Sequence, residues 1–277
     1  MYPEALSYLR CPHHPAHALT LSADDVQGAD GTIRDGTLTC VGCAARYPIR
    51  DGIADLLPGL GLPPTLAQLT NALPVAAWAY ERSWRPRALT LLTGEPFGYE
   101  RELPLVVGLV DVPRGGLIVD VACSNGLYAR ALERARNGLP GHVIGIDHSL
   151  PMLKQARAFA QREGVRISFV RARAQALPFA PATAATLVMG GSLNEIGDSG
   201  KALSELHRTL APDGRCVLMS LVKGSTTAGR TLQAGLGLGG VEFPTLTELN
   251  RRLAVAGLRL RAQWRYGVVV FSLLMRS

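Results

Sequence analysis

The stretch L-I-V-D-V-A-C-S-N-G at residues 117–126 decides the fold of this chain. A short apolar run ends on Asp120 and gives way to small side chains, which is typical of a buried strand that leads into a tight turn. From Leu127 onward, apolar residues recur on one helical face and charged residues on the other, so a helix follows the turn. Strand, turn and helix together predict the opening of a βαβ unit, whose turn and helix N-terminus can bind a nucleotide.

A second apolar run, H-V-I-G-I at residues 142–146, predicts the next parallel strand and ends on Asp147. An acidic side chain at this place can accept both hydroxyls of a ribose. It follows Gly126 by 21 residues, close to the roughly 20 expected between the turn and the ribose carboxylate. The alternative is that Asp120 and Asp147 only cap the next helix or turn.

Composition sets the broad class of the protein. The 277 residues, 47% of them apolar, are enough for one sizeable domain and a small one, and they argue against disorder. A net charge of +7 would suit an anionic partner, but the chain has no run of five or more basic residues. The longest late apolar run, residues 267–275, has only the length of a strand, so we expect a soluble, cytoplasmic protein without a signal peptide or a spanning helix.

The first 58 residues predict a small separate unit that binds a metal. Cys11 and His14 form one pair and Cys40 and Cys43 another, each with two residues between its ends, and a hairpin would place all four around a tetrahedral zinc ion. His13 and His17 are rival ligands to His14. Since four protein ligands leave no open position for water, a bound zinc would be structural. The alternative is a metal-free hairpin with stray cysteines.

Residues 59–64 form a Gly- and Pro-rich linker, and residues 65–112 predict helical segments interrupted by prolines. We interpret this region as a cap over the turn at residues 122–126. Tyr80 and Trp84 lie four residues apart, on one helical face. They either line an acceptor pocket or simply pack against the core.

Beyond the second strand, the pattern predicts a doubly wound α/β sheet that ends in an antiparallel hairpin. Ser149 is the expected N-cap of a helix at residues 151–163. The remaining expected elements are strands at residues 167–170, 186–189, 215–222, 259–265 and 268–275, and helices at residues 201–210 and 246–256, which brings the sheet to seven strands.

Four segments together resemble the class I S-adenosylmethionine-dependent methyltransferases, over residues 113–277. They are V-D-V-A-C-S-N-G-L-Y-A-R-A-L from residue 119, G-I-D-H-S-L-P-M-L-K-Q-A-R from residue 145, A-L-P-F-A from residue 176 and A-L-S-E-L-H-R-T-L-A-P-D-G-R-C-V-L from residue 202. The resemblance implies a Rossmann-like seven-stranded methyltransferase sheet. The N-terminal part, with L-R-C-P and R-Y-P-I-R-D-G, is similar to zinc ribbons that accompany or activate methyltransferases, and the whole plan resembles a plastid and cyanobacterial methyltransferase group.

Three positions depart from the family pattern. The usual G-x-G-x-G turn is A-C-S-N-G here, the acidic residue before A-x-x-L-P-F is Arg173, and the usual Phe-Asp before the fourth strand is Ala184-Ala185. A guanidinium group cannot accept a hydrogen bond from the adenine amino group. The resemblance therefore implies that the backbone at Ala174 holds the adenine, or that cofactor binding is weakened or altered.

The resemblance also implies a set of site residues. The expected cofactor-binding residues are Asp120, Ala122, Cys123, Ser124, Gly126, Asp147, His148, Met152, Arg173, Ala174 and Gly190. Glu195, His148 and Tyr128 are candidate bases, and Tyr80, Trp84, Asn194 and Glu195 are expected on the substrate side. Two alternatives stay open: Cys123 is only a small buried filler, and Asn194 and Glu195 only cap the helix that begins near Ser199.

Three functions compete on this reading. The first is an S-adenosylmethionine-dependent methyltransferase, with structural zinc, that acts on a small apolar molecule. The second is a ribosomal RNA base methyltransferase, because zinc ribbons also precede a guanine methyltransferase family that the chain partly resembles. The third is a methyltransferase-like scaffold without catalysis, which Arg173 and the missing glycines would explain. We expect a small-molecule acceptor, with RNA less favoured, and no integral membrane association; the sequence leaves the oligomeric state open.

Overall fold

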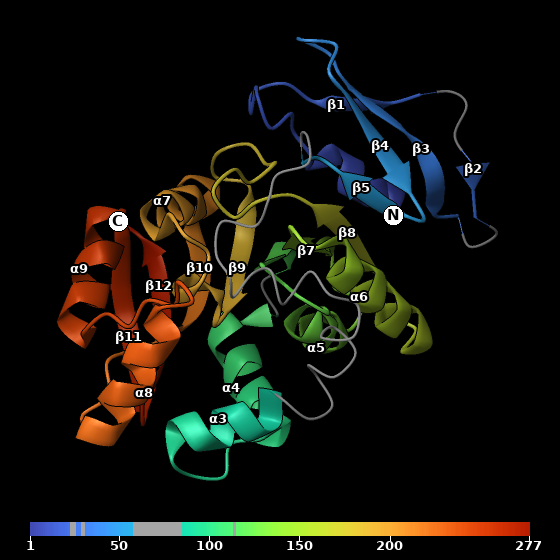
Figure 1. The fold of residues 1–277 in the computed structure, drawn as a ribbon. Helices are drawn as coiled ribbons and strands as arrows, with labels where there is room; N and C mark the ends of the chain where they lie inside the picture. The colour runs from blue at the N-terminus through green and yellow to red at the C-terminus, as the bar shows by residue number, and fades with distance from the viewer. Residues whose placement is uncertain (23–25, 29–30, 58–84, 113–114) are drawn as a thin grey trace.

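The computed structural model describes residues 1–22, 26–28, 31–57, 85–112 and 115–277. In these residues twelve strands form one sheet, with helices on both of its faces (Figure 1). The helix predicted around Tyr80 and Trp84 lies outside the described residues. No helix among the described residues has both the length and the apolar character needed to cross a lipid bilayer.

The C-terminal half of the sheet has the predicted seven strands, in the order β8-β7-β6-β9-β10-β12-β11. The first five strands of that order are parallel, and β12 runs antiparallel to both β10 and β11, as the predicted terminal hairpin requires. Their bounds are β6 Gly116–Val121, β7 Gly141–Asp147, β8 Ile167–Arg171, β9 Ala184–Gly190, β10 Leu210–Leu221, β11 Leu258–Tyr266 and β12 Val269–Arg276. These findings confirm the Rossmann-like α/β fold class.

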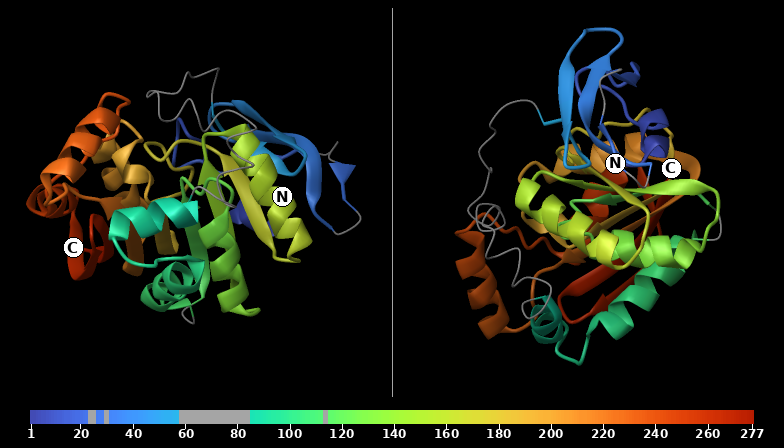
Figure 2. Two further views of the ribbon diagram at one scale, coloured as in Figure 1. Left: turned by 60° about the horizontal axis from the view of Figure 1, so that its bottom comes forward. Right: turned by 90° about the vertical axis from the view of Figure 1, so that its right-hand side faces the viewer.

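Helices cover both faces of the sheet (Figure 2). A hydrophobic core lies on each of these faces. Helices α4, α5 and α6 contribute side chains to one core, and α7 and α9 contribute to the other. The helices are α3 Arg85–Thr93, α4 Tyr99–Val110, α5 Leu127–Arg136, α6 Leu150–Arg162, α7 Ser199–Thr209, α8 Thr227–Gly237 and α9 Leu246–Val255, with short 3₁₀ turns η1 Pro3–Ser7 and η4 Ser192–Asn194. Helix α4 runs through Pro104, where the sequence predicted an interruption, and α8 was not predicted.

The helix caps explain several of these boundaries. The Ser149 side chain accepts a hydrogen bond from the Met152 N–H at the start of α6, as predicted. Asp198 caps α7, and Thr245 forms a capping box with Glu248 at the start of α9. A cap satisfies backbone N–H groups that have no partner inside the helix, so each of these residues fixes where its helix begins.

The N-terminal strands extend the main sheet beyond the seven strands predicted. They are β1 Leu19–Leu21, β2 Val26–Gln27, β3 Ile33–Cys40, β4 Arg46–Arg50 and β5 Ile53–Asp55. Strands β1, β3, β4 and β5 follow one another as antiparallel neighbours, and β5 then pairs in parallel with β8. Leu38 and Tyr47 of this part share one hydrophobic core with the C-terminal half. The sequence gives no signal for this pairing, because it joins segments that are more than 100 residues apart.

The turn between β6 and α5 has an unusual backbone. Ala122 and Ser124 adopt φ angles of 54° and 51°, and Gly126 adopts 76°. These are the three positions at which the family pattern has glycine. The left-handed conformation costs a residue with a Cβ roughly 1–2 kcal/mol, so the turn keeps the family's shape with two strained residues.

Replacing the two strained residues should stabilise the protein. We expect Ala122→Gly and Ser124→Gly each to raise the free energy of unfolding by about 1 kcal/mol, because glycine adopts φ > 0 without the Cβ clash. Chemical denaturation of the single variants and the wild type measures this. Gly138→Ala is a matched control: Gly138 also has a positive φ, 80°, and open space around its Cα, so the same strain is added there. Unchanged or lower stability of both glycine variants would contradict the interpretation of the turn.

Candidate active site and metal centre

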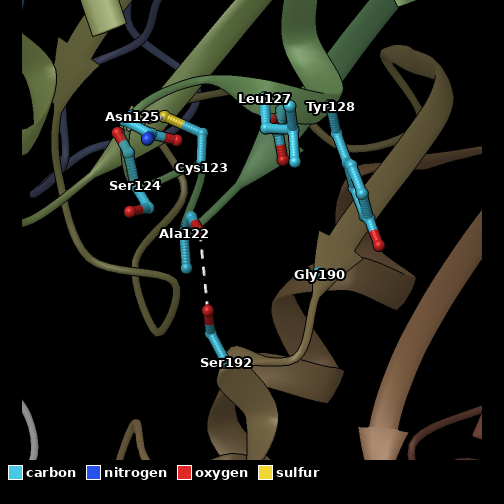
Figure 3. A pocket seen from close by; sticks show the side chains of 9 residues that line it. Ala122, Cys123, Ser124, Asn125, Leu127, Tyr128, Gly190 and Ser192 are labelled. Carbon is cyan, nitrogen blue, oxygen red and sulfur yellow. Dashed lines mark hydrogen bonds between the residues drawn. The ribbon is translucent and has the colours of Figure 1, made fainter. Parts of the chain in front are cut away.

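A small pocket opens at the carboxyl ends of β6 and β9 (Figure 3). The chain leaves β6 toward β7 on one side, while β9 lies on the other side, so this is the switch point where doubly wound sheets bind ligands. The Ser192 hydroxyl donates a hydrogen bond to the Ala122 carbonyl across the mouth, at 3.5 Å. The lining residues are Asp120, Ala122, Cys123, Ser124, Asn125, Leu127, Tyr128, Gly190 and Ser192.

Asp147 lies beside this turn, as the spacing predicted. One carboxylate oxygen accepts a hydrogen bond from the Ser124 N–H and the other from the Ser149 N–H, both at 2.8 Å. The Ser124 hydroxyl also donates to the Met152 sulfur at 3.5 Å. The turn, the acidic residue and the first turn of α6 therefore form one connected group.

Asp120 has the capping role that the sequence left open. It is buried, and its carboxylate accepts a hydrogen bond from the Ala129 N–H in the first turn of α5, at 2.9 Å. It also contributes to the lining of the pocket. Asp120 therefore fixes the direction of α5, whose N-terminus faces the pocket.

Gly126 and Gly190 make room for neighbouring side chains of the protein. A Cβ on Gly126 would lie 3.2 Å from both Ala156 and Phe169, so this glycine lets the turn pack against α6 and β8. Gly126 is not among the residues that line the pocket, and its expected contact with the cofactor stays a prediction. A Cβ on Gly190 would lie 2.7 Å from the Tyr128 ring, so Gly190 makes room for that ring at the pocket.

Tyr128 is buried, and its hydroxyl donates a hydrogen bond to Glu102 of α4. The Met219 sulfur lies 3.7 Å from the same hydroxyl. The predicted candidate base therefore faces a carboxylate that the sequence did not single out. Glu102 and Met219 come from distant segments, and no local pattern connects them to Tyr128.

Glu195 is a candidate base whose acidity is altered by its surroundings. Burial raises the pKa of its carboxyl to about 7, and the negative charge of Asp147 acts in the same direction. A carboxylate with this pKa can accept a proton near neutral pH. His148, another candidate, lies at the edge: its Nδ1 is 3.5 Å from Asp147, and its side chain is 29% exposed.

Asn194 is a structural residue rather than a substrate contact, which corrects the prediction. Its side-chain NH₂ donates to the carbonyls of Leu221 and Glu242 at 2.8 and 2.6 Å, and its oxygen accepts from the Leu221 N–H. The side chain is thus committed to fixing η4 against β10. The capping alternative is also wrong for Asn194, because Asp198 caps α7.

The remaining predicted cofactor residues differ in exposure. The Arg173 side chain is exposed, and Ala174 beside it is buried. Cys123 is buried at the pocket, where burial raises the pKa of its thiol well above the usual value, and Asp120 and Asp147 add to this effect. Cys123 therefore remains a neutral thiol, in keeping with the role of a small filler.

Three lining residues were not predicted. Asn125 lies in the turn, Leu127 is the first residue of α5, and Ser192 lies in the segment after β9. All three lie in segments that were predicted to form the site, but nothing in their residue types singled them out as lining residues.

The four predicted metal ligands converge at one end of the N-terminal hairpin. One ligand atom from each of Cys11, His14, Cys40 and Cys43 lies within 4.8 Å of all the others, which confirms the predicted cluster. Three cysteine sulfurs and one imidazole form a donor set that suits a tetrahedral zinc ion. Of the rivals, His13 is exposed, while His17 stacks on His14 with ring centroids 5.4 Å apart.

The loop around Cys40 is built to hold a thiolate. Burial acts to raise the pKa of Cys40, but backbone hydrogen bonds at Cys43 and Gly42 and contacts with the neighbouring thiols outweigh it and lower that pKa to about 6. The thiolate is the form that binds metal. Gly42 must lack a side chain, because a Cβ there would lie 1.8 Å from the His17 ring. His17 therefore packs over this loop without being one of the four residues whose ligand atoms converge.

Comparisons with known proteins agree with this geometry. Residues 118–214 match the model of a family described as a methyltransferase domain. A 2-phytyl-1,4-naphtoquinone methyltransferase of Thermosynechococcus vestitus is 32% identical over 45% of this chain and 54% of its own length. An uncharacterized chloroplastic methyltransferase of Arabidopsis thaliana is 28% identical over 63% of this chain and 51% of its own. The chain thus spans about half the length of these two relatives.

A solved structure extends the comparison to the fold. A SAM-dependent methyltransferase from Aquifex aeolicus superposes with a TM-score of 0.55 at 19% identity, over 74% of this chain and 99% of that one. The family match covers the turn and the loop after β9, which line the pocket, and Asp147 beside the turn. Residues 118–214 therefore resemble a methyltransferase domain, and the chain has the Rossmann-like α/β fold of its solved neighbour.

Proposed function

We propose that this protein transfers the methyl group of S-adenosylmethionine to a small apolar acceptor. The observation that carries the proposal is the position of Asp147 beside the Ser124 turn, at the switch point of the sheet. The family match and the fold support methyl transfer, and the name of the Thermosynechococcus relative supports a quinone-type aromatic acceptor over RNA. A pocket that is partly lined by Leu127 and the Tyr128 ring suits such a molecule.

The donor set around the turn fits an adenosyl group. Each Asp147 oxygen accepts one backbone N–H and keeps a second lone pair for a ribose hydroxyl. The small side chains of Ala122 and Ser124 allow close approach, and the N-terminus of α5 faces the pocket. Because Arg173 cannot accept a hydrogen bond, we assign the adenine amino group to the backbone near Ala174.

When bound, S-adenosylmethionine supplies a methyl group that is already activated on a sulfonium sulfur. The protein's share is then to orient the acceptor, exclude water and remove a proton where the acceptor carries one. Glu195 accepts that proton on its carboxylate. Tyr128, held by Glu102, positions the aromatic face of the acceptor beside Gly190.

We further propose that Cys11, His14, Cys40 and Cys43 bind one structural zinc ion. All four ligand positions belong to the protein, so no position remains for a reacting water. A bound metal would add to the stability that the N-terminal hairpin gains by packing its apolar side chains into the shared core.

Binding of S-adenosylhomocysteine tests the cofactor assignment. We expect the wild type to bind this ligand in calorimetry and Asp147→Ala to bind about 10- to 100-fold more weakly, since charge-assisted hydrogen bonds to the ribose are lost. Thr245→Ala, which removes a helix cap far from the pocket, should keep full affinity. If Asp147→Ala binds as well as the wild type, the assignment fails.

Glu195→Gln should lower the activity of the protein but raise its stability at alkaline pH. Activity of the wild type should rise with pH through about 7, and kcat of the variant should fall by a factor of about 10² to 10⁴. Because burial raises the pKa of Glu195 in the folded protein, the contribution of this group to stability is largest below about pH 4.5 and is lost as the pH rises through about 7. At pH 8 the free energy of unfolding of the variant should therefore be roughly 1–3 kcal/mol higher than that of the wild type.

Denaturation curves at pH 5 and pH 8 and a pH–rate profile measure both effects. Glu100→Gln, an exposed carboxylate on α4, is the matched control and should change neither. A variant that keeps the wild-type pH profile would remove Glu195 from the mechanism.

Elemental analysis of the native protein should find one zinc per chain. We expect His14→Ala and Cys43→Ser to lose the metal and to lower the melting temperature. We expect His17→Ala to keep the metal, because His17 contacts the Cys40 sulfur at 4.0 Å but is not one of the four groups whose ligand atoms converge. Retention of zinc by His14→Ala together with its loss from His17→Ala would reverse the ligand assignment.

A further inference from the structure

One arginine connects the N-terminal strands to the loop that follows β7, beside Asp147. Strand β5 pairs in parallel with β8, and its last residue, Asp55, lies opposite Arg171, the last residue of β8 (Figure 1). The Asp55 carboxylate and the Arg171 guanidinium form an ion pair at 2.9 Å, with side chains 24% and 21% exposed. The Nε–H of the same guanidinium donates to the His148 carbonyl at 2.9 Å. One planar group thus contacts the N-terminal part and the loop after β7 at the same time.

The contact with His148 acts on a peptide group that also holds Asp147. The His148 carbonyl and the Ser149 N–H belong to one planar peptide, so fixing the oxygen fixes the direction of the N–H. That N–H donates to the Asp147 carboxylate at 2.8 Å. The other Asp147 oxygen accepts from the Ser124 N–H of the turn. A continuous series of contacts therefore runs from Asp55 to the turn.

Backbone contacts support the same series. The Leu56 N–H donates to the Arg171 carbonyl at 2.9 Å, and the Ala172 N–H donates to the Asp147 carbonyl at 3.0 Å. The ends of β5, β8 and β7 are thus joined side by side at the cofactor edge of the sheet. The side chain of Arg171 adds a contact between a charged group of β8 and the peptide that orients Asp147.

We infer that Arg171, held by Asp55, is a positioning residue for the cofactor site, and that the N-terminal unit is therefore part of that site. This inference rests on the proposed function. Arg171 touches neither the pocket nor the assigned acceptor; it sets the peptide plane at His148 and, through it, the Asp147 carboxylate. Losing the N-terminal contact should loosen this carboxylate and weaken cofactor binding.

The chain offers a matched control on the same strand. Arg166, just before the first residue of β8, pairs with Glu4 of the N-terminal part at 2.7 Å. This ion pair also joins the N-terminal part to the sheet, but at the end of β8 that is remote from Asp147. Glu4→Gln should therefore lower stability slightly without changing cofactor affinity, because exposed ion pairs contribute little.

Calorimetry with S-adenosylhomocysteine on the full chain tests the inference. We expect Asp55→Asn and Arg171→Gln to weaken binding by about 5- to 50-fold, and Glu4→Gln to bind like the wild type. Since Asp55 acts through Arg171, the double variant should bind no more weakly than Arg171→Gln alone. Arg171→Lys should restore little, because a single ammonium cannot contact both partners as the guanidinium does.

Hydrogen exchange of the Ser149 amide gives a second readout that needs no cofactor. Exchange should be faster in Asp55→Asn and unchanged in Glu4→Gln, with melting temperatures recorded for both. Wild-type affinity in Asp55→Asn, or the same change in Glu4→Gln, would overturn the inference while the proposed function stood. Failure of the wild type itself to bind S-adenosylhomocysteine would instead overturn the proposed function.

Discussion

The parallel pairing of β6 with β7 is the constraint on which the site depends. In this register Val121 lies opposite Ile146, and the Cys123 N–H donates to the Ile146 carbonyl at 2.9 Å. The turn and Asp147 therefore leave the sheet side by side, and the hydrogen bond from Ser124 to Asp147 closes the gap between them. A shift of one residue in this register would send every side chain to the other face and separate the two parts.

The same hydrogen bond explains how the turn keeps its shape without two of its glycines. Ala122 and Ser124 occupy left-handed conformations that disfavour side chains. The surrounding contacts hold them there: Asp147 binds the Ser124 N–H, Met152 accepts from its hydroxyl, and Ser192 binds the Ala122 carbonyl. Strained residues persist where the surroundings determine their conformation, and such positions cluster at functional sites. The departure from the family pattern thus changes the stability of the turn more than its geometry.

The sequence predicted what local patterns encode and missed what distant segments create. Apolar runs located the seven C-terminal strands, the Ser149 cap fixed α6, and the spacing of cysteines and His14 located the metal cluster. The structural role of Asn194 depends on the carbonyls of Leu221 and Glu242, and the partner of Tyr128 is Glu102, in a helix that precedes the first strand of this half. Gly126 was predicted at the ligand because of its motif, and the structure adds its packing against Ala156 and Phe169. None of these partners has a signature in the sequence near the residue it contacts.

The joining of the N-terminal strands to β8 follows from the needs of both partners. A strand at the edge of a sheet exposes unpaired N–H and C=O groups, and β5 satisfies those of β8. The N-terminal part is too small to form a hydrophobic core alone. Its residues Leu38 and Tyr47 are buried in a core that they share with the C-terminal half. Because β5 ends where β8 ends, this pairing also brings Asp55 to the edge at which ligands bind in doubly wound folds. A contact that stabilises the sheet edge is thereby also the contact that reaches Arg171 and the peptide beside Asp147.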